Sequence, residues 1–142
     1  MYKKILIPLD HTDSDKTILE HIRPLARTFG AELILIHVAD GYAARLQDTL
    51  NLQDSEEIKS DKRYLEKQRD VLISEGFKAQ AHLFKGEPAD EILAVVKKEQ
   101  CDLIAMSTHG HRFLKDILFG SVAENIRHRT DVPVLMIRAK HR

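Results

Sequence analysis

The sequence predicts an α/β fold, a single domain with a doubly wound, five-stranded parallel sheet and helices on both faces. Five short apolar runs are typical of buried strands, and helical patterns separate most of them. Strands that alternate with helices pair in parallel, and right-handed crossovers place the helices on both faces. A length of 142 residues fits one domain, so we expect a single domain over residues 1–142.

The composition narrows the classes of function. Lys and Arg number 22 together, as do Asp and Glu, so no excess of charge favours nucleic acid or an acidic membrane. The apolar run near the N-terminus is too short for a signal peptide or a membrane span. The only cysteine, Cys101, has no partner for an internal disulfide. We therefore expect a cytoplasmic protein that binds neither nucleic acid nor membrane.

Residues 5–30 predict the first strand and helix. The continuous apolar run 5–9 ends at Asp10, as in a strand that is buried on both faces. Residues 12–14 offer helix N-caps, and Gly30 offers a stop. Pro24 predicts a kink or a break inside the helix. The buried face of this helix is predicted to consist of Ile18, Ile22, Leu25 and Phe29.

The middle of the chain repeats this pattern. Residues 33–38 form a second buried run, and the segment 41–55 has no sustained period, so we expect a loop there. Residues 56–75 are rich in charge, and their apolar positions recur every seven residues. This spacing predicts a solvated helix that ends at Gly76 and has a narrow apolar stripe. The stripe consists of Ile58, Leu65 and Leu72.

The remaining elements complete the sheet. Residues 77–84 alternate only partly, which is typical of a strand near a sheet edge. Pro88 opens a third helix at its first position, and residues 102–106 form a fourth strand. Pro133 lacks an amide hydrogen, so the final strand, 132–138, is expected to begin there or to lie at an edge. The third helix is expected to bury Ala89, Ile92, Leu93 and Val96.

The segment from Ser107 to Ser121 indicates a phosphate site. Gly110 follows a strand, and Gly120-Ser121 comes after nine intervening residues. Glycine lets backbone N–H groups approach a phosphate, and a helix N-terminus attracts anions. Ser121 and Glu124 fit a capping box, so we predict that the last helix starts at Ser121. Each glycine alone is also consistent with an ordinary turn or helix junction.

These residues resemble the universal stress protein (UspA) family. Its nucleotide-binding branch carries Gly, two residues, Gly, nine residues, and then Gly followed by Ser or Thr. The resemblance extends over the whole chain. The matching segments are Lys4-Ile5-Leu6-Ile7-Pro8-Leu9-Asp10, His37-Val38, Gly86-Glu87-Pro88, Ser107-Thr108-His109-Gly110, Gly120-Ser121 and Asp131-Val132-Pro133-Val134-Leu135.

The resemblance implies a domain of the HUP, or adenine nucleotide alpha hydrolase-like, class that binds ATP or AMP, usually as a homodimer. By position, the adenosine side is expected to be lined by Pro8, Leu9, Asp10, Val38 and Met106, with Val38 meeting the adenine through its backbone. The phosphates are expected to lie among Ser107, His109, Gly110, Gly120, Ser121 and Val122. Mg²⁺ or Mn²⁺ is expected among the phosphate oxygens, without assigned protein ligands.

Ser107 departs from the motif, because it stands where the family has its first glycine. If this position needs a positive φ, serine costs energy; if it needs only a small residue, the hydroxyl adds a contact. We favour the second interpretation. The departure leaves an alternative open, a dimeric interaction module of the same fold that binds no nucleotide.

Other functions have weaker signals. The sequence has no G-x-S-x-G elbow, no Walker A loop and no dinucleotide fingerprint. No carboxylate base is evident near the phosphates, so we expect no dedicated enzyme and at most slow ATP hydrolysis. A phosphoacceptor receiver domain would use Asp10 but needs a second aspartate where Val38 or Met106 stands. His11, Asp13 and Asp15 are interpreted as parts of a helix cap rather than as a metal site.

The last strand is the expected dimer interface. Val132 to Ile137 is hydrophobic and is predicted to lie near a sheet edge. An uncovered edge strand pairs readily with its symmetry mate. We therefore expect a homodimer through this strand.

Overall fold

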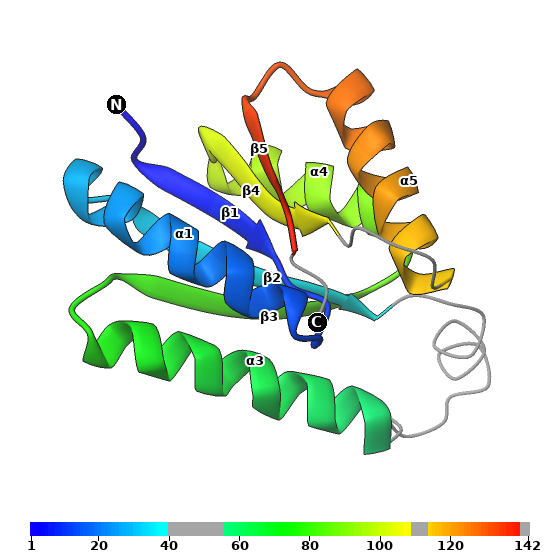
Figure 1. Cartoon of the computed structure of the whole chain (residues 1–142), viewed down its shortest axis with the longest axis horizontal. Helices are drawn as coiled ribbons and strands as arrows, with labels where there is room; N and C mark the ends of the chain where they lie inside the picture. Colours follow the sequence, from blue (N-terminus) through cyan, green and yellow to red (C-terminus); the bar gives the residue numbers. More distant parts are fainter. Residues whose placement is uncertain (40–55, 109–113, 140–142) are drawn as a thin grey trace.

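The computed structural model describes residues 1–39, 56–108 and 114–139, and the side chains of all of these except 114–121. In chain order the elements are β1 (Lys4–Pro8), α1 (Ser14–Phe29), β2 (Glu32–Ala39), α3 (Glu56–Ser74), β3 (Ala79–Lys85), α4 (Pro88–Glu99), β4 (Leu103–Thr108), α5 (Leu114–Arg129) and β5 (Val134–Arg138). The strands form a five-stranded parallel sheet in the order β3-β2-β1-β4-β5 (Figure 1). This order confirms the predicted doubly wound α/β fold.

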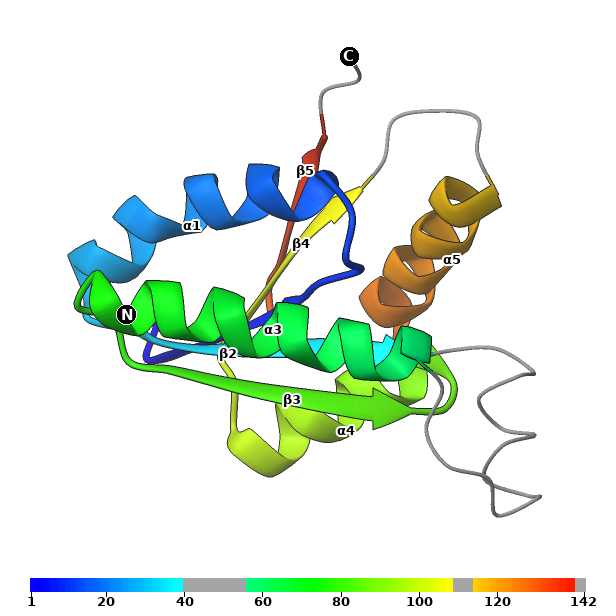
Figure 2. The same cartoon turned by 90° about the horizontal axis from the view of Figure 1, so that it is seen from below.

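Two hydrophobic clusters lie on the two faces of the sheet. Ile5 and Ile7 of β1 pack with α1 and α3, whereas Leu6 packs with α4 and α5. Figure 2 shows α1 and α4 on opposite sides of the strands. Successive residues of a strand point to opposite faces, so a strand covered on both sides is apolar at every position. This explains the continuous apolar runs of β1 and β2.

Helix α1 ends as predicted but does not break. Gly30 has φ +63° and its N–H bonds to carbonyls of the last turn, which confirms the expected stop. The helix continues through Pro24, so of the predicted kink or break the break does not occur. Pro24 lies on the exposed side of α1, where water can bond the carbonyl that loses its helical partner. Buried neighbours such as Ile22 hold the helix on the sheet.

Helix α3 and the edge strands follow the sequence pattern. Ile58, Leu65 and Leu72 are the buried residues of α3, which confirms the seven-residue stripe. β3 and β5 lie at the two edges of the sheet, as their patterns predicted. Pro133 directly precedes β5 and therefore removes no bond from the strand itself.

The start of the last helix differs from the prediction. α5 begins at Leu114 rather than at Ser121, so Gly120 and Ser121 lie inside it. Leu114, Lys115 and Leu118 are good helix formers, no proline interrupts residues 114–119, and a glycine inside a helix costs only about 1 kcal/mol relative to alanine. Propensity over these two turns therefore outweighs the capping-box pattern. Among the helices that the structure describes, none is long and apolar enough to cross a membrane.

Candidate functional site

The sheet order reverses between β1 and β4, and the predicted adenosine residues lie at the adjoining strand ends. Pro8 ends β1, Val38 lies near the end of β2, and Met106 lies near the end of β4. In doubly wound sheets the crevice at such a reversal is the usual ligand site. The structure thus brings together the parts of the predicted site that come from β1, β2 and β4.

Burial limits what some of these residues can offer. Leu9 and Met106 are 2% and 0% exposed as whole residues and belong to the hydrophobic clusters on opposite faces. In this conformation neither the side chain nor the main chain of these two residues offers a ligand more than a trace of surface. Asp10 and Val38 are partly exposed, so their side chains remain accessible.

Ser107 is buried and has a partner for its hydroxyl group. Its Oγ donates a hydrogen bond to the backbone carbonyl of Ser14, at 2.7 Å. Among the described non-glycine residues only His11 and Gln100 have positive φ, so serine at position 107 is not strained. This agrees with the interpretation that the position needs a small residue. The hydroxyl contact, however, joins β4 to the start of α1.

The loop between β1 and α1, residues 9–13, is held by the carboxylate of Asp15. Oδ1 accepts a hydrogen bond from the Asp10 N–H at 3.0 Å, and Oδ2 accepts one from the His11 N–H at 2.9 Å. Asp13 occupies the N-cap position of α1 without a side-chain cap bond. The Thr12 hydroxyl oxygen accepts from the Ser14 N–H at 3.3 Å, whereas the Asp15 carboxylate reaches backward and bonds the loop before the helix.

Asp15 also receives a bond from α3. The Tyr64 hydroxyl donates to Asp15 Oδ2 at 2.7 Å, and the Asp15 side chain is buried. Burial raises the pKa of Asp15 to about 7, and the negative charge of Asp10 adds to the rise. The same burial, with the Asp15 charge, raises the pKa of the Tyr64 hydroxyl well above its usual value, so this hydroxyl keeps its proton and remains a donor.

A second set of contacts joins α3 to the same loop. Asp61 Oδ1 lies 2.6 Å from His11 Nδ1, and Asp61 Oδ2 lies 3.2 Å from His37 Nε2. His37 Nδ1 lies 2.7 Å from the carbonyl oxygen of Leu9. A carbonyl only accepts, so Nδ1 of His37 is the donor in that bond. The His11 ring stacks on Tyr64, with 4.0 Å between the ring centroids.

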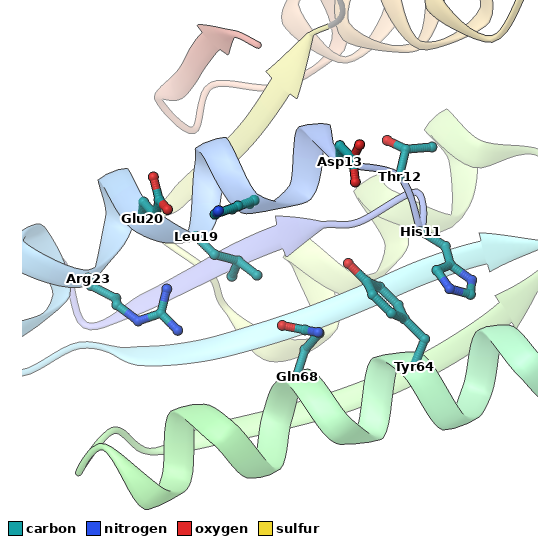
Figure 3. Close-up of a pocket in the computed structure, with 9 residues that line it drawn as sticks. His11, Thr12, Asp13, Leu19, Glu20, Arg23, Tyr64 and Gln68 are labelled. Carbon is teal, nitrogen blue, oxygen red and sulfur yellow. The ribbon is translucent and has the colours of Figure 1, made fainter. Parts of the chain in front are cut away.

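A cavity of about 490 Å³ opens between α1 and α3. It is lined by His11, Thr12, Asp13, Lys16, Leu19, Glu20, Arg23, Tyr64 and Gln68. In Figure 3 the Tyr64 side chain extends from α3 toward the loop that carries His11 and Thr12. Among the predicted nucleotide-binding residues whose side chains the structure describes, none lines this cavity. The cavity is therefore separate from the described part of the predicted nucleotide site, although both border the loop 9–13.

The phosphate side of the predicted site is described only in part. His109 and Gly110 lie outside the described residues, and for Gly120 and Ser121 only the helical backbone is described. Val122 is nearly buried and packs in the cluster beneath α5. Within residues 1–39, 56–108 and 122–139, no three His, Cys, Asp or Glu side chains are placed to hold a metal ion.

Sequence reasoning missed the residues of α3 that contact the loop 9–13. Asp61 and Tyr64 lie in a charged, solvated stretch whose pattern shows only the apolar stripe. They contact residues 50 and 49 positions away along the chain. The seven-residue stripe could have indicated which helix face meets the sheet, but not which loop the polar residues beside it would reach.

Comparison with known proteins identifies one family throughout. The model of the universal stress protein family matches residues 1–138. The universal stress protein MJ0577 of Methanocaldococcus jannaschii is 31% identical, over 99% of this chain and 98% of the relative, and YxiE of Bacillus subtilis is 27% identical, over 97% and 100%. The solved structure of MJ0577 has a TM-score of 0.84 at 32% identity and covers 100% of this chain and 99% of that one.

Proposed function

Because the chain belongs to the universal stress protein family, we propose that it binds an adenine nucleotide, ATP or AMP, and regulates a stress response. The observation that carries the proposal is the reversal of the strand order between β1 and β4. Asp10, Val38 and Ser107 lie at or just beyond the carboxyl ends of β1, β2 and β4, on the same side of the sheet. Two solved universal stress proteins of this fold are described in complex with dAMP, from Archaeoglobus fulgidus, and with cAMP. The protein is proposed to act as one domain, over residues 1–142, in the cytoplasm.

The adenosine would be held at the ends of β1, β2 and β4. Pro8, Leu9 and Met106 are buried as whole residues, so they would contact the ligand only after a local rearrangement. Val38 would meet the adenine through its backbone. The Asp10 carboxylate accepts bonds from the hydroxyls of Thr12 at 2.5 Å and Ser14 at 3.3 Å, and a ribose hydroxyl would be a further donor of the same kind.

The phosphates would lie among Ser107, His109, Gly110, Gly120, Ser121 and Val122. Inside a helix, the N–H groups of Gly120 and Ser121 bond to carbonyls four residues earlier. To bind a phosphate, these N–H groups must be released, so α5 would begin near Ser121 in the complex. Nucleotide binding is therefore expected to unwind about two turns of α5.

A divalent cation, Mg²⁺ or Mn²⁺, would neutralise the phosphates. The described residues supply no cluster of ligands for it, so phosphate oxygens and water would provide most of its ligands. No described carboxylate is assigned as a base for the attacking water. We therefore expect at most slow hydrolysis and no dedicated enzymatic activity.

Calorimetric titration of the purified protein with ATP and with AMP, with and without Mg²⁺, tests the proposal. Saturable binding supports it, and no binding at about millimolar nucleotide, the weak end of specific affinities, contradicts it. Gly120→Val should abolish binding, because its side chain would crowd a phosphate at that position. Gly76→Ala, at a positive φ at the end of α3, is the control for lost stability: it strains the backbone away from the proposed site and should bind as the wild type does.

A second candidate function is a dimeric interaction module without nucleotide. It is favoured by Ser107, whose hydroxyl is already bonded to Ser14, and by Met136 on the edge strand β5, which is 41% exposed. In either function a homodimer would form through Val132 to Ile137. Light scattering at micromolar concentration checks this, and Met136→Lys should shift the protein toward monomer because it places a charge in the interface.

A further inference from the structure

The β1–α1 loop has a backbone shape that needs support from outside the loop. His11 has φ +62°, a conformation that is unfavourable for residues other than glycine. The N–H groups of Asp10 and His11 bond to a side chain, Asp15, rather than to a strand or a helix. The shape of the loop therefore depends on where the Asp15 carboxylate lies.

Two polar side chains of α3, Tyr64 and Asp61, contact the groups that hold this loop. Tyr64 donates to Asp15 Oδ2, the oxygen that also accepts from the His11 N–H. Asp61 contacts the His11 ring directly and reaches the Leu9 carbonyl through His37. Asp61 and Tyr64 are three residues apart, so they lie on the same side of α3. Leu9, Asp10 and His11 are thus all connected to one turn of one helix.

These contacts are directional, which distinguishes them from the rest of the α3 interface. The buried residues of α3 are the apolar Ile58, Leu65 and Leu72, and apolar packing by itself fixes no hydrogen-bond geometry. Hydrogen bonds between 2.6 and 2.9 Å, made to a carboxylate, are strong and specific in direction. α3 therefore stabilises one conformation of the loop 9–13, although the helix and the loop are far apart in the sequence.

We propose that Tyr64 and Asp61 are positioning residues, which hold the backbone of Leu9, Asp10 and His11 in the conformation that receives the nucleoside. The inference rests on the proposed function, because Leu9 and Asp10 are part of the proposed adenosine site. Neither Tyr64 nor Asp61 touches the nucleotide in this role. Each acts through Asp15 or through the two histidines.

Two conservative variants test the proposal. Tyr64→Phe removes only the hydroxyl, and Asp61→Asn leaves an amide that can accept from one histidine but not from both. We expect each variant to bind nucleotide about tenfold more weakly in calorimetric titration, the loss typical of one charge-assisted hydrogen bond. The matched controls are Tyr2→Phe, at the other end of β1, and Asp70→Asn, exposed on α3. Both controls should bind within about twofold of the wild type, a difference too small for the loss of such a bond.

A second measurement needs no nucleotide. In Tyr64→Phe, NMR should show faster amide hydrogen exchange at Asp10 and His11, with unchanged exchange in β2. The Asp15 carboxyl should titrate at a higher pH than in the wild type, because a hydrogen bond to its ionised form is lost.

The outcomes separate this inference from the proposed function. A wild type that binds no nucleotide contradicts the proposed function, and exchange at Asp10 and His11 then still decides whether Tyr64 positions the loop. If the wild type binds and both variants bind equally well, the positioning role is wrong. The role is also wrong if binding weakens while the exchange of the loop amides and the titration of Asp15 do not change.

Discussion

The buried carboxyl of Asp15 predicts an unusual dependence of stability on pH. Its pKa is raised from 3.8 in the unfolded chain to about 7 in the folded protein. Between these values the folded protein holds a proton that the unfolded chain has released. A rise in pH removes that proton from the folded state at a cost, so the contribution of Asp15 to stability is full below 3.8 and is lost as pH rises toward 7.

The size of the effect follows from the shift. Each pH unit in this window lowers the free energy of unfolding by roughly 1 to 2 kcal/mol. Other groups titrate in the same range, so the useful quantity is the difference between the wild type and Asp15→Asn, which has no ionisable group at this position. From about pH 4.5 to about pH 6.5 the wild type should lose roughly 3 kcal/mol relative to the variant.

Urea denaturation followed by circular dichroism measures this difference. Both proteins are unfolded at several pH values, and the free energies of unfolding are subtracted at each pH. A difference that stays flat, or one in which the wild type gains stability relative to Asp15→Asn as pH rises, would refute the reasoning. The Asp13→Asn variant is the control, since Asp13 makes no side-chain cap bond and should track the wild type.

Three further predictions concern the fold, and each is checked by urea denaturation against the wild type. Ser107→Ala should lower the free energy of unfolding by about 0.5–1.5 kcal/mol, the net contribution of one hydrogen bond, because the Ser14 carbonyl loses the bond from Ser107 but stays in the first turn of α1; an unchanged value would show that this bond contributes nothing. Gly30→Ala should cost about 1 kcal/mol from its left-handed backbone alone, since no atom lies within 4 Å of an added Cβ; a stabilised variant would contradict this. Leu35→Ala, in the fully buried strand β2, should cost about 2–5 kcal/mol, and a loss below this range would mean that the cavity collapses.

Local patterns of burial were enough to predict most of the fold. The buried stretches 5–8 of β1 and 33–36 of β2 are apolar at every position because both faces are covered. The stripe of α3 is narrow because most of the rest of that helix faces solvent. The helix start at Ser121 was wrong, because the prediction relied on one capping motif and α5 already begins at Leu114. At Pro24 the helix does not break, because buried neighbours on both sides of the proline hold it on the sheet.

The candidate site was less predictable than the fold. The sequence predicted that the carboxyl ends of β1, β2 and β4 lie on the same side of the sheet. The burial of Leu9 and Met106 follows from packing that a single sequence does not show. The contacts of Asp15 with Tyr64 and of His11 with Asp61 join distant parts of the chain. They depend on the tilt and rotation of α3, which its apolar stripe determines only coarsely.

The hydrogen bond from Ser107 to Ser14 has a mechanical consequence. The strand order reverses between β1 and β4, and this bond joins the end of β4 to the start of α1, the helix that follows β1. A glycine at position 107 would leave these two segments free to move apart. With serine, any separation of these two segments must break a buried hydrogen bond, at a cost of about 0.5–1.5 kcal/mol.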